Sequence, residues 1–303
     1  MNEPTPREQH YAEFYGFADE DDGRPVAWVH GNCQAESLRL QLDGPDLRTV
    51  RVPAVHELTS EDLPHLRRLT ERTDVWVAQP IREDYRGLPV GTATLADAMP
   101  ESRLVRVPVV RFAGLYPTQV TVRPPSDTSL DPPIVAYHDL DTLWEAAGHP
   151  AHQLHLDVDD VHEIAERSMA ELRKRERHHR TVEVSDLFEH PGFEQMRTLN
   201  HPGNSVLLEL AVRVRRELGL DDQVAPIGRE LLNAVHSPRS PVVAEAFGLD
   251  ESEVRDAWLV DGEPVATDRV REAHLAWYSE HPDAVDAGLE RYRDTLALFG
   301  LAA

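Results

Sequence analysis

Residues 25–42 read PVAWVHGNCQAESLRLQL, and this stretch decides the fold. It begins with a short apolar run, Pro25–Val29, that is typical of a buried strand. The residues at 30–32 are turn-like, and the leucines at positions 38 and 42 have the spacing of one helix face. The stretch therefore predicts a strand, a tight turn and a helix.

Short apolar runs recur through the first half of the chain. Several are separated by segments long enough for a crossover helix, such as residues 60–70. Strands that alternate with helices favour a mainly parallel sheet. We therefore predict an α/β fold with a small, mainly parallel sheet flanked by helices. The further predicted strands are residues 50–52, 74–78, 103–107 and 133–136.

The second half of the chain has the periodicity of helices. Residues 157–179 place an apolar stripe opposite a charged face, and a second stripe runs from residue 202 or 203 to about Leu218, where Gly219 stops it. Further helices are predicted at 251–258 and 268–280. The predicted division is an acidic N-terminal arm at 1–23, an α/β core at 24–150 and a large, mainly helical part at 151–303 that completes the site.

The composition excludes several classes of protein. Of 303 residues, 54 are Asp or Glu and 31 are Lys or Arg, so the net charge of −23 disfavours nucleic acid as a partner. The single cysteine, Cys33, excludes an intrachain disulfide framework and a multi-cysteine metal site. No apolar stretch is long enough to span a bilayer, and the N-terminus lacks the features of a signal peptide. We therefore expect a cytoplasmic protein without a membrane span.

The histidine-rich segment 149–162 raises the alternative of a metal site. Its imidazole and carboxylate side chains suit zinc or another divalent ion, but their spacing fits no motif in which the ligands must converge. We therefore expect no metal cofactor.

The only cysteine lies at the predicted junction of strand and helix, where open parallel sheets form their ligand crevices. Backbone N–H groups and the dipole at the start of the helix favour the thiolate of Cys33, which makes it a candidate nucleophile. The N–H groups of Cys33 and Gln34 are also candidates to bind the oxyanion that forms when an acyl group is attacked. Gly31 lets the backbone turn sharply and keeps the approach to the sulfur open.

A thiolate mechanism needs a base, and a second polar turn, Asn200-His201-Pro202, supplies a candidate. Pro202 suits the first turn of a helix. We therefore expect His201 to be held at a helix entrance, where it can move protons.

Polar residues after two other predicted strands complete the candidate site. If the strand that ends at Ala78 is a parallel neighbour of the first strand, Gln79 reaches the same sheet edge as Cys33 and can donate to an oxyanion. Arg82 and Arg86 are candidates for phosphate contacts, because a guanidinium matches phosphate oxygens. A fourth patch, Tyr137-His138-Asp139, ends another predicted strand, where His138 or Asp139 can line the crevice.

With these motifs in this order, the chain resembles the WcbI family of polysaccharide-biosynthesis proteins. The resemblance extends from about residue 24 to the C-terminal helices. What it implies is a coenzyme A-binding acetyltransferase that acts in capsular or other polysaccharide assembly, with acetyl-CoA as donor. The motifs that carry it are Gly31-Asn32-Cys33-Gln34, Gln79-Pro80, Tyr137-His138-Asp139 and Asn200-His201-Pro202.

The expected mechanism combines the residues with the resemblance. Cys33 attacks or positions the acyl thioester, and His201 moves protons. The backbone amides of Cys33 and Gln34, together with Gln79, stabilise the oxyanion. In a direct-transfer variant, His201 deprotonates the acceptor hydroxyl and Cys33 is never acylated. The residues assigned to coenzyme binding are Asn32, Arg82, Tyr85, Arg86, His138, Asn200 and Asn204.

Two other functions stay open at this point. One is a thioester or ester hydrolase of the SGNH/GDSL kind, whose layered α/β arrangement the predicted fold can share. Against it, Cys33 stands where these hydrolases use Ser, and no Asp-x-x-His pair ends at His201. The other is a non-catalytic coenzyme A-binding protein. The expected partners are a small-molecule acyl donor and a saccharide-type acceptor, while homo-oligomer formation is left open.

Overall fold

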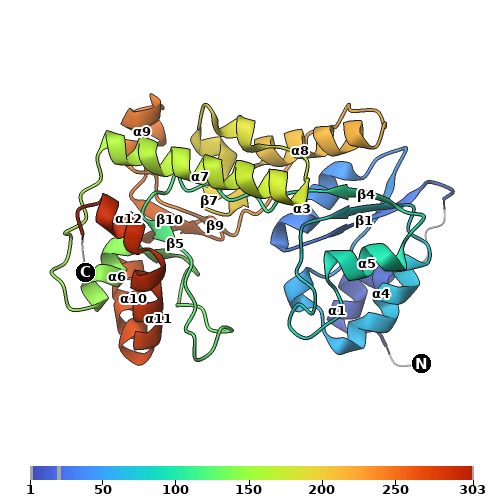
Figure 1. The fold of residues 1–303 in the computed structure, drawn as a ribbon, viewed down its shortest axis with the longest axis horizontal. Helices are drawn as coiled ribbons and strands as arrows, with labels where there is room; N and C mark the ends of the chain where they lie inside the picture. The colour runs from blue at the N-terminus through green and yellow to red at the C-terminus, as the bar shows by residue number, and fades with distance from the viewer. Residues whose placement is uncertain (1–2, 19–21, 302–303) are drawn as a thin grey trace. The chain divides into compact units, whose positions relative to one another are not determined.

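The computed structural model describes residues 3–18 and 22–301. Its contacts group the chain into two compact units, each with its own core (Figure 1). The predicted domain boundaries after residues 23 and 150 stay predictions, because both units are discontinuous in sequence. Unit 1 comprises the chain up to Val110 together with Leu172–Asp186 and Gly203–Leu232, and unit 2 comprises Arg111–Glu171, Leu187–Pro202 and the chain from Asn233 onward.

Unit 1 is built on a four-stranded sheet in the order β2-β1-β3-β4, in which every neighbouring pair is parallel. This confirms the predicted α/β fold with a mainly parallel sheet. The central strands β1 and β3 consist almost entirely of buried residues, as expected where both faces of a parallel sheet are covered. The strands are β1 (Val26–His30), β2 (Arg48–Val50), β3 (Val75–Ala78) and β4 (Arg103–Arg106).

Helices cover both faces of this sheet (Figure 1). α4 (Leu63–Thr70) and α5 (Thr92–Ala98) lie over one face. α3 (Cys33–Leu42) packs with α8 (Asn204–Glu217) over the other. α3, α4 and α8 are the helices predicted at residues 34–42, within 60–70 and up to residue 218, whereas α5 was not predicted. Short 3₁₀ turns at Val55–Glu57 and Ser60–Asp62 precede α4.

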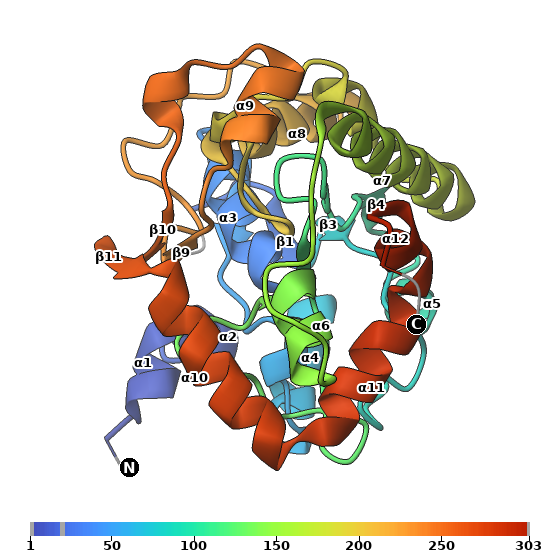
Figure 2. The same cartoon turned by 90° about the vertical axis from the view of Figure 1, so that its left-hand side faces the viewer.

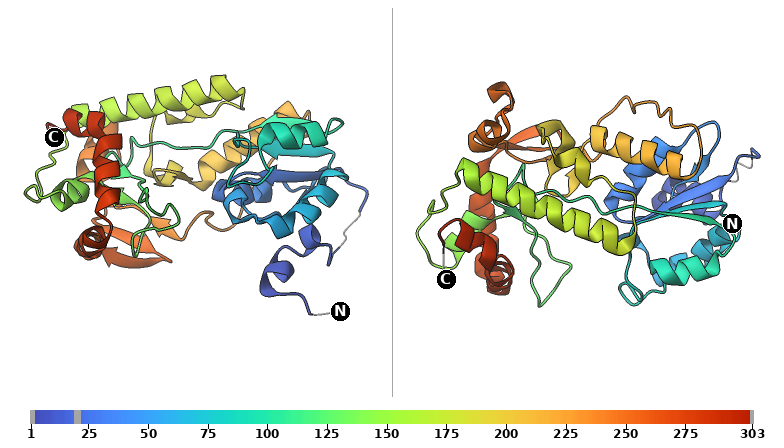
Figure 3. Two further views of the ribbon diagram at one scale, coloured as in Figure 1. Left: turned by 60° about the horizontal axis from the view of Figure 1, so that its bottom comes forward. Right: turned by 45° about the horizontal axis from the view of Figure 1, so that its top comes forward.

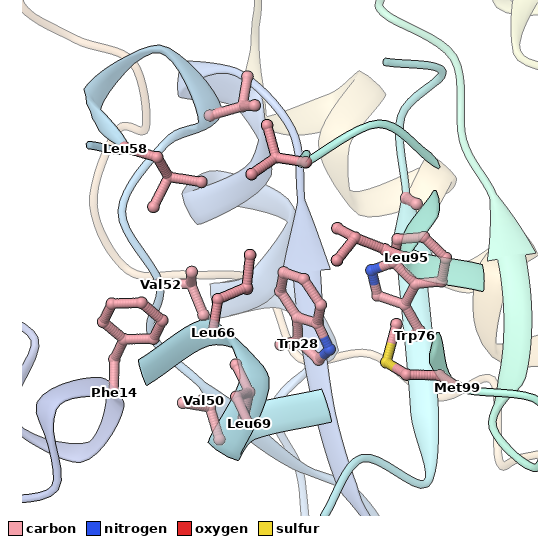
Figure 4. Close-up of a cluster of buried hydrophobic side chains, with 13 residues drawn as sticks. Phe14, Trp28, Val50, Val52, Leu58, Leu66, Leu69, Trp76, Leu95 and Met99 are labelled. Carbon is pink, nitrogen blue, oxygen red and sulfur yellow. The ribbon is translucent and has the colours of Figure 1, made fainter. Parts of the chain in front are cut away.

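The face of the sheet under α4 and α5 holds an aromatic core (Figure 4). Trp28 of β1 and Trp76 of β3 stack with their ring centroids 5.8 Å apart. Phe14, from the N-terminal helix α2 (Ala12–Tyr15), is only 1% exposed in the same cluster. The described part of the predicted arm, which also contains α1 (Pro6–His10), is therefore packed onto unit 1. Residues 19–21 of its acidic run lie outside the described residues.

Unit 2 combines short antiparallel strand pairings with helices (Figure 2). One sheet has the strand order β11-β10-β9, and two further pairs join β5 to β6 and β7 to β8. The strands are β5 (Gln119–Val120), β6 (His138–Asp139), β7 (Met196–Thr198), β8 (His201–Pro202), β9 (Val235–His236), β10 (Ala257–Val260) and β11 (Glu263–Ala266).

Helices surround these strands, and the longest of them, α7, is the helix predicted at residues 157–179 (Figure 3). It begins in unit 2, and its residues from Leu172 onward belong to unit 1. The helices are α6 (Leu140–Ala146), α7 (Val158–His179), α9 (Pro241–Phe247), α10 (Thr267–Glu280), α11 (Pro282–Arg291) and α12 (Arg293–Leu298), with 3₁₀ turns at Ser185–Phe188, Phe193–Gln195 and Glu251–Glu253.

Two predicted elements are wrong. The helix predicted at 251–258 is a 3₁₀ turn followed by the start of β10. The reason lies just beyond it, because Asp261 and Gly262 have φ of 51° and 85°, the left-handed values that a two-residue hairpin turn requires. The strand predicted at 133–136 is irregular, since Pro133 cannot donate to a sheet and Ile134 has a φ of 72°.

Among the helices of the described residues, none combines the length and the hydropathy that crossing a membrane requires.

Candidate active site

The sequence-predicted site residues form two clusters, one in each unit. In unit 1, Cys33 follows β1 and is the first residue of α3, at the carboxyl end of the sheet. Gln79 follows β3, and the parallel pairing of β1 with β3 places it at the same edge. The strand order reverses between β1 and β3, which is the topological switch point at which open α/β sheets bind ligands.

Gln79 fixes the backbone of the turn before Cys33. Its Oε1 accepts a hydrogen bond of 2.8 Å from the backbone N–H of Asn32. Its Nε2 donates to Oε1 of Gln34 at 3.2 Å and to the carbonyl of Pro108 at 3.4 Å. Because both Nε2 hydrogens are directed at protein acceptors and the side chain is 3% exposed, this geometry gives Gln79 a positioning role and does not support the predicted donation to an oxyanion.

Gly31 is required by close packing. A Cβ at this position would lie 2.4 Å from Oε1 of Gln79 and 2.7 Å from its Cδ, well inside van der Waals contact. The sequence analysis attributed this glycine to a sharp turn and an open path to the sulfur. The structure gives a different physical reason, which is that the Gln79 side chain lies directly against it.

Gln34 and Asn32 hold the start of α3. The Gln34 side chain forms a two-point pair with Val110, donating from Nε2 to its carbonyl at 2.8 Å and accepting its N–H at 3.0 Å. Asn32 caps α3, because its Oδ1 accepts the backbone N–H of Gln34 at 2.9 Å. The Gln34 N–H predicted to bind an oxyanion is thus used by the cap.

The ionisation of Cys33 differs from the sequence expectation. Burial raises the pKa of the Cys33 thiol, while the N–H groups of Cys33 and Gln34 act in the opposite direction and are outweighed. The thiol is therefore mostly protonated at neutral pH. A mechanism in which its sulfur attacks a thioester needs a base to remove this proton.

The second cluster lies in unit 2 and consists of Tyr137, Thr198, Asn200 and His201, called here the His201 cluster. The Tyr137 hydroxyl oxygen lies 2.7 Å from Oδ1 of Asn200 and 2.9 Å from Oγ1 of Thr198. Nδ1 of His201 lies 3.3 Å from the same hydroxyl oxygen. Oγ1 of Thr198 also lies 3.2 Å from Oδ1 of Asn200, so the hydroxyl hydrogens of Tyr137 and Thr198 can be arranged in two ways, and the network is compatible with both neutral tautomers of His201.

His201 is neutral at physiological pH. Burial lowers its pKa to about 4, and the nearby charge of His236 acts in the same direction. Its neutral imidazole can accept a proton. Pro202 belongs to the short strand β8 rather than to the first turn of α8, which starts at Asn204, so the predicted helix entrance is displaced by the strand pair β7-β8.

The residues assigned to coenzyme binding lie in different environments. Arg82 and Arg86 flank Tyr85, with their guanidinium carbons 5.9 and 6.0 Å from its ring centroid. Arg86 also donates to the carbonyl of His56 at 2.8 Å. All three lie in the loop after β3, in unit 1 with Cys33.

His138 and Asn204 are engaged inside the protein. His138 is completely buried, and its Nδ1 and Nε2 lie 2.5 Å from the Tyr278 hydroxyl and 3.0 Å from the Val122 carbonyl. Asn204 donates to the carbonyl of Arg229 at 2.8 Å and accepts from the N–H of Leu231 at 2.9 Å. These contacts give both side chains a role in packing and do not support the predicted contact with a coenzyme.

The described residues also form two pockets, and Tyr137 and Asp139 of the fourth predicted patch line one of them. One of about 630 Å³ in unit 1 is at the edge of the sheet where Val26, Val75 and Arg103 begin their strands, opposite the Cys33 edge. One of about 530 Å³ in unit 2 includes Tyr137 of the His201 cluster. Most of the lining of the second pocket comes from segments far apart in the chain, so its extent could not be predicted from a local motif.

Comparison with known proteins gives two findings. The family model described as polysaccharide biosynthesis enzyme WcbI matches residues 26–223. A solved structure of WcbI, described as a novel polysaccharide biosynthesis enzyme, has a TM-score of 0.77 and 20% sequence identity, and the match covers 91% of this chain and 97% of that one. That structure is described as the native protein without a disulfide bond between coenzyme A and one of its cysteines. None of the curated proteins compared with the chain matches it.

Proposed function

Because the chain belongs to the WcbI family of polysaccharide biosynthesis enzymes, we propose that it transfers an acyl group, acetyl in the simplest case, from a coenzyme A thioester to a saccharide hydroxyl. The description of the similar WcbI structure names coenzyme A and a cysteine together. Cys33 is the only cysteine of this chain, and it lies at the switch point of the sheet. These observations support coenzyme A as the acyl donor.

The observation that carries the proposal is the rigid placement of the Cys33 thiol. The side chains of Asn32 and Gln79 accept backbone N–H groups on either side of Cys33, and the Gln34 side chain links this region to Val110 and Gln79. A cysteine that served only to fill the core needs no such support. Precise placement of a reacting group is worth several kcal/mol of a reaction barrier, of the order of 7–11 kcal/mol in the best cases.

In the proposed acyl-enzyme route, the Cys33 sulfur attacks the thioester carbonyl. The bond from the acyl carbon to Cys33 forms, the bond to the coenzyme sulfur breaks, and the proton of Cys33 passes through a base to the departing coenzyme thiolate. The acceptor hydroxyl then attacks the acyl-cysteine, its proton leaves through the same base, and the Cys33 thiol is restored. We propose His201 of unit 2 as the candidate for this base on the state of its own ring, which burial keeps neutral and which therefore carries a lone pair on one nitrogen.

Phosphate recognition belongs to the proposal as well. We assign contacts with the coenzyme phosphates to Arg82 and Arg86, which are exposed and lie in the same unit as Cys33. Tyr85 between them offers an aromatic face to the adenine or the pantetheine arm.

The test is release of coenzyme A from acetyl-CoA, measured as free thiol with and without an added mixture of saccharides. The proposal predicts release that rises when saccharide is present and is lost in Cys33→Ala. Release that is complete without any acceptor would instead indicate a hydrolase. Calorimetry with coenzyme A adds a direct measure of binding, and the absence of any binding would overturn the proposal.

A further inference from the structure

The pocket of about 530 Å³ lies entirely within unit 2. Its volume falls in the range of about 300–1,000 Å³ that small-molecule sites occupy. It is lined by residues 115–119, by residues of β6 and the start of α6, by residues between 152 and 156, by the turn before α9, by residues between 254 and 258 and by the first turns of α10. The proposed chemistry at Cys33 does not use this pocket.

One wall of the pocket is aromatic. Tyr137 and Trp258 both line it, and their rings stack with centroids 6.1 Å apart and an angle of 17° between the planes. Both side chains belong to a buried cluster and are only 6% and 4% exposed, so they give the pocket a small, rigid apolar patch.

A second wall carries two guanidinium groups. Arg239 and Arg255 both line the pocket and are joined by paired backbone hydrogen bonds of 2.8 and 3.1 Å. Arg239 forms an ion pair with Glu253 at 3.1 Å. Arg255 donates from Nε to the carbonyl of Ala257 at 3.0 Å and from Nη2 to that of Ser237 at 2.9 Å. The two carbonyls hold its guanidinium in a fixed direction.

Arg255 is a cation without a counter-charge. Over residues 3–18 and 22–301, no carboxylate lies within ion-pair distance of it. Burial and the like charge of Arg239 both lower the pKa of Arg255, which shows that this place is unfavourable for its charge. An anionic group in the pocket would relieve the repulsion between the two guanidinium groups.

The remaining polar lining suits sugar hydroxyls. Asp268, in the first turn of α10, is exposed and lines the pocket, as do Asp141 and Thr118. Carboxylates accept hydrogen bonds from hydroxyl groups and repel anions. A ligand with hydroxyls along most of its length and one anionic group therefore fits this lining better than a polyanion does.

The pocket shares a residue with the His201 cluster. The ring of Tyr137 forms part of the pocket wall, while its hydroxyl contacts Oδ1 of Asn200 and Nδ1 of His201. A ligand in the pocket therefore lies beside the residue whose hydroxyl contacts His201. We propose that this pocket binds the acceptor of the acyl transfer, and that the acceptor is a saccharide with a carboxylate or phosphate group paired with Arg255. The role of this ligand as the acceptor rests on the proposed function, whereas its chemical class rests on the lining of the pocket alone.

The test is calorimetric binding to the full chain without any acyl donor, with glucuronate, glucose 1-phosphate and glucose as probes. We expect at least one anionic sugar to bind about tenfold or more tightly than glucose, and the two anionic probes distinguish carboxylate from phosphate. Arg255→Gln should weaken that binding about tenfold. Arg167→Gln is the matched control, because Arg167 is exposed, pairs with Glu163 and does not line the pocket.

A second variant provides an independent test if Arg255→Gln fails to fold. Asp268→Asn removes a negative charge from an exposed position, so it should tighten binding of the anionic sugar by about twofold. Equal binding of charged and neutral sugars, no binding of either anionic probe, or displacement of a bound sugar by coenzyme A would each overturn the inference. If acetyl-CoA acylates the chain but no anionic sugar binds, only this inference is overturned. If the sugar binds but the chain is never acylated and never releases coenzyme A, only the proposed transfer is overturned.

Discussion

At the scale of single residues, the turn around Cys33 depends on one missing side chain. Gly31→Ala places a methyl group 2.4 Å from Oε1 of Gln79, so that side chain must move and the Asn32 N–H loses its acceptor. We expect a loss of about 1–3 kcal/mol in the free energy of unfolding, measured by urea denaturation. Gly228→Ala is the matched control, because a Cβ there meets nothing within 4 Å.

A double variant tests the cause of that loss. If the clash with Gln79 is responsible, Gly31→Ala combined with Gln79→Ala should cost less than the sum of the two single variants, because the second change removes the atoms that the first one meets. Costs that simply add would show that Gly31 and Gln79 do not interact in this way.

The Cys33 thiol should titrate above the usual range for cysteine. Burial raises its pKa, so the rate of alkylation by iodoacetamide should have its inflection above about pH 8.5, the value for an exposed thiol. An inflection below that value would show that the helix dipole outweighs burial, as the sequence alone suggested.

The proposed role of His201 predicts how kcat/KM depends on pH on the acid side. A base must be unprotonated, and burial lowers the pKa of His201 to about 4, so kcat/KM should stay constant from neutral pH down to about 5.5 and fall only below that. The measurement is coenzyme A release over short times, with circular dichroism as a check of folding. A midpoint near about 6.5, the value for an exposed histidine, would contradict the buried position of the base.

At the scale of elements, variants of Asn32, the cap of α3, test how helix capping affects the reactivity of the Cys33 thiol. Asn32→Ala removes the acceptor of the Gln34 N–H and should cost about 0.5–2 kcal/mol in unfolding free energy. Asn32→Asp keeps an oxygen at the cap and adds a negative charge beside the sulfur. It should therefore retain the free energy of unfolding, measured by urea denaturation, and raise the pKa of Cys33 further, measured by the pH dependence of alkylation.

Elements with clear local signals were predictable from the sequence. The first strand, the turn and α3 follow from apolar periodicity, and α8 ends at Glu217, shortly before Gly219, whose φ of 65° suits the left-handed position after a helix. The hairpin of β10 and β11 was not predicted, although Asp261-Gly262 is a strong turn signal, because the helix predicted at 251–258 overlaps the start of its first strand.

The candidate site was predictable only in part. The shared sheet edge of Cys33 and Gln79 follows from the parallel strand order. The direction of the Gln79 amide, the use of the Gln34 N–H in a cap and the burial of His138 depend on tertiary packing, which no local pattern contains. The lining of the unit 2 pocket combines residues more than 100 positions apart, so it also lay beyond sequence reasoning.

At the scale of the whole molecule, buried histidines couple stability to pH. Burial lowers the pKa of His30, His138 and His201 to about 4 in the folded state, while the unfolded chain binds these protons near pH 6.5. The unfolded state therefore binds more protons between these values, and stability falls as the pH drops through this window, by about 1.4 kcal/mol per pH unit for each group that titrates. Urea denaturation at about pH 7 and pH 5 measures the change, and equal midpoints would contradict the burial of these rings.

The central claim is that Cys33 carries the acyl group during transfer. Intact mass spectrometry of the chain after incubation with acetyl-CoA tests this most directly, with Cys33→Ala as the control. The account predicts a mass gain of one acetyl group that is absent in the variant and disappears when an acceptor is added. A wild-type chain that binds coenzyme A and supports transfer without ever gaining this mass would contradict it.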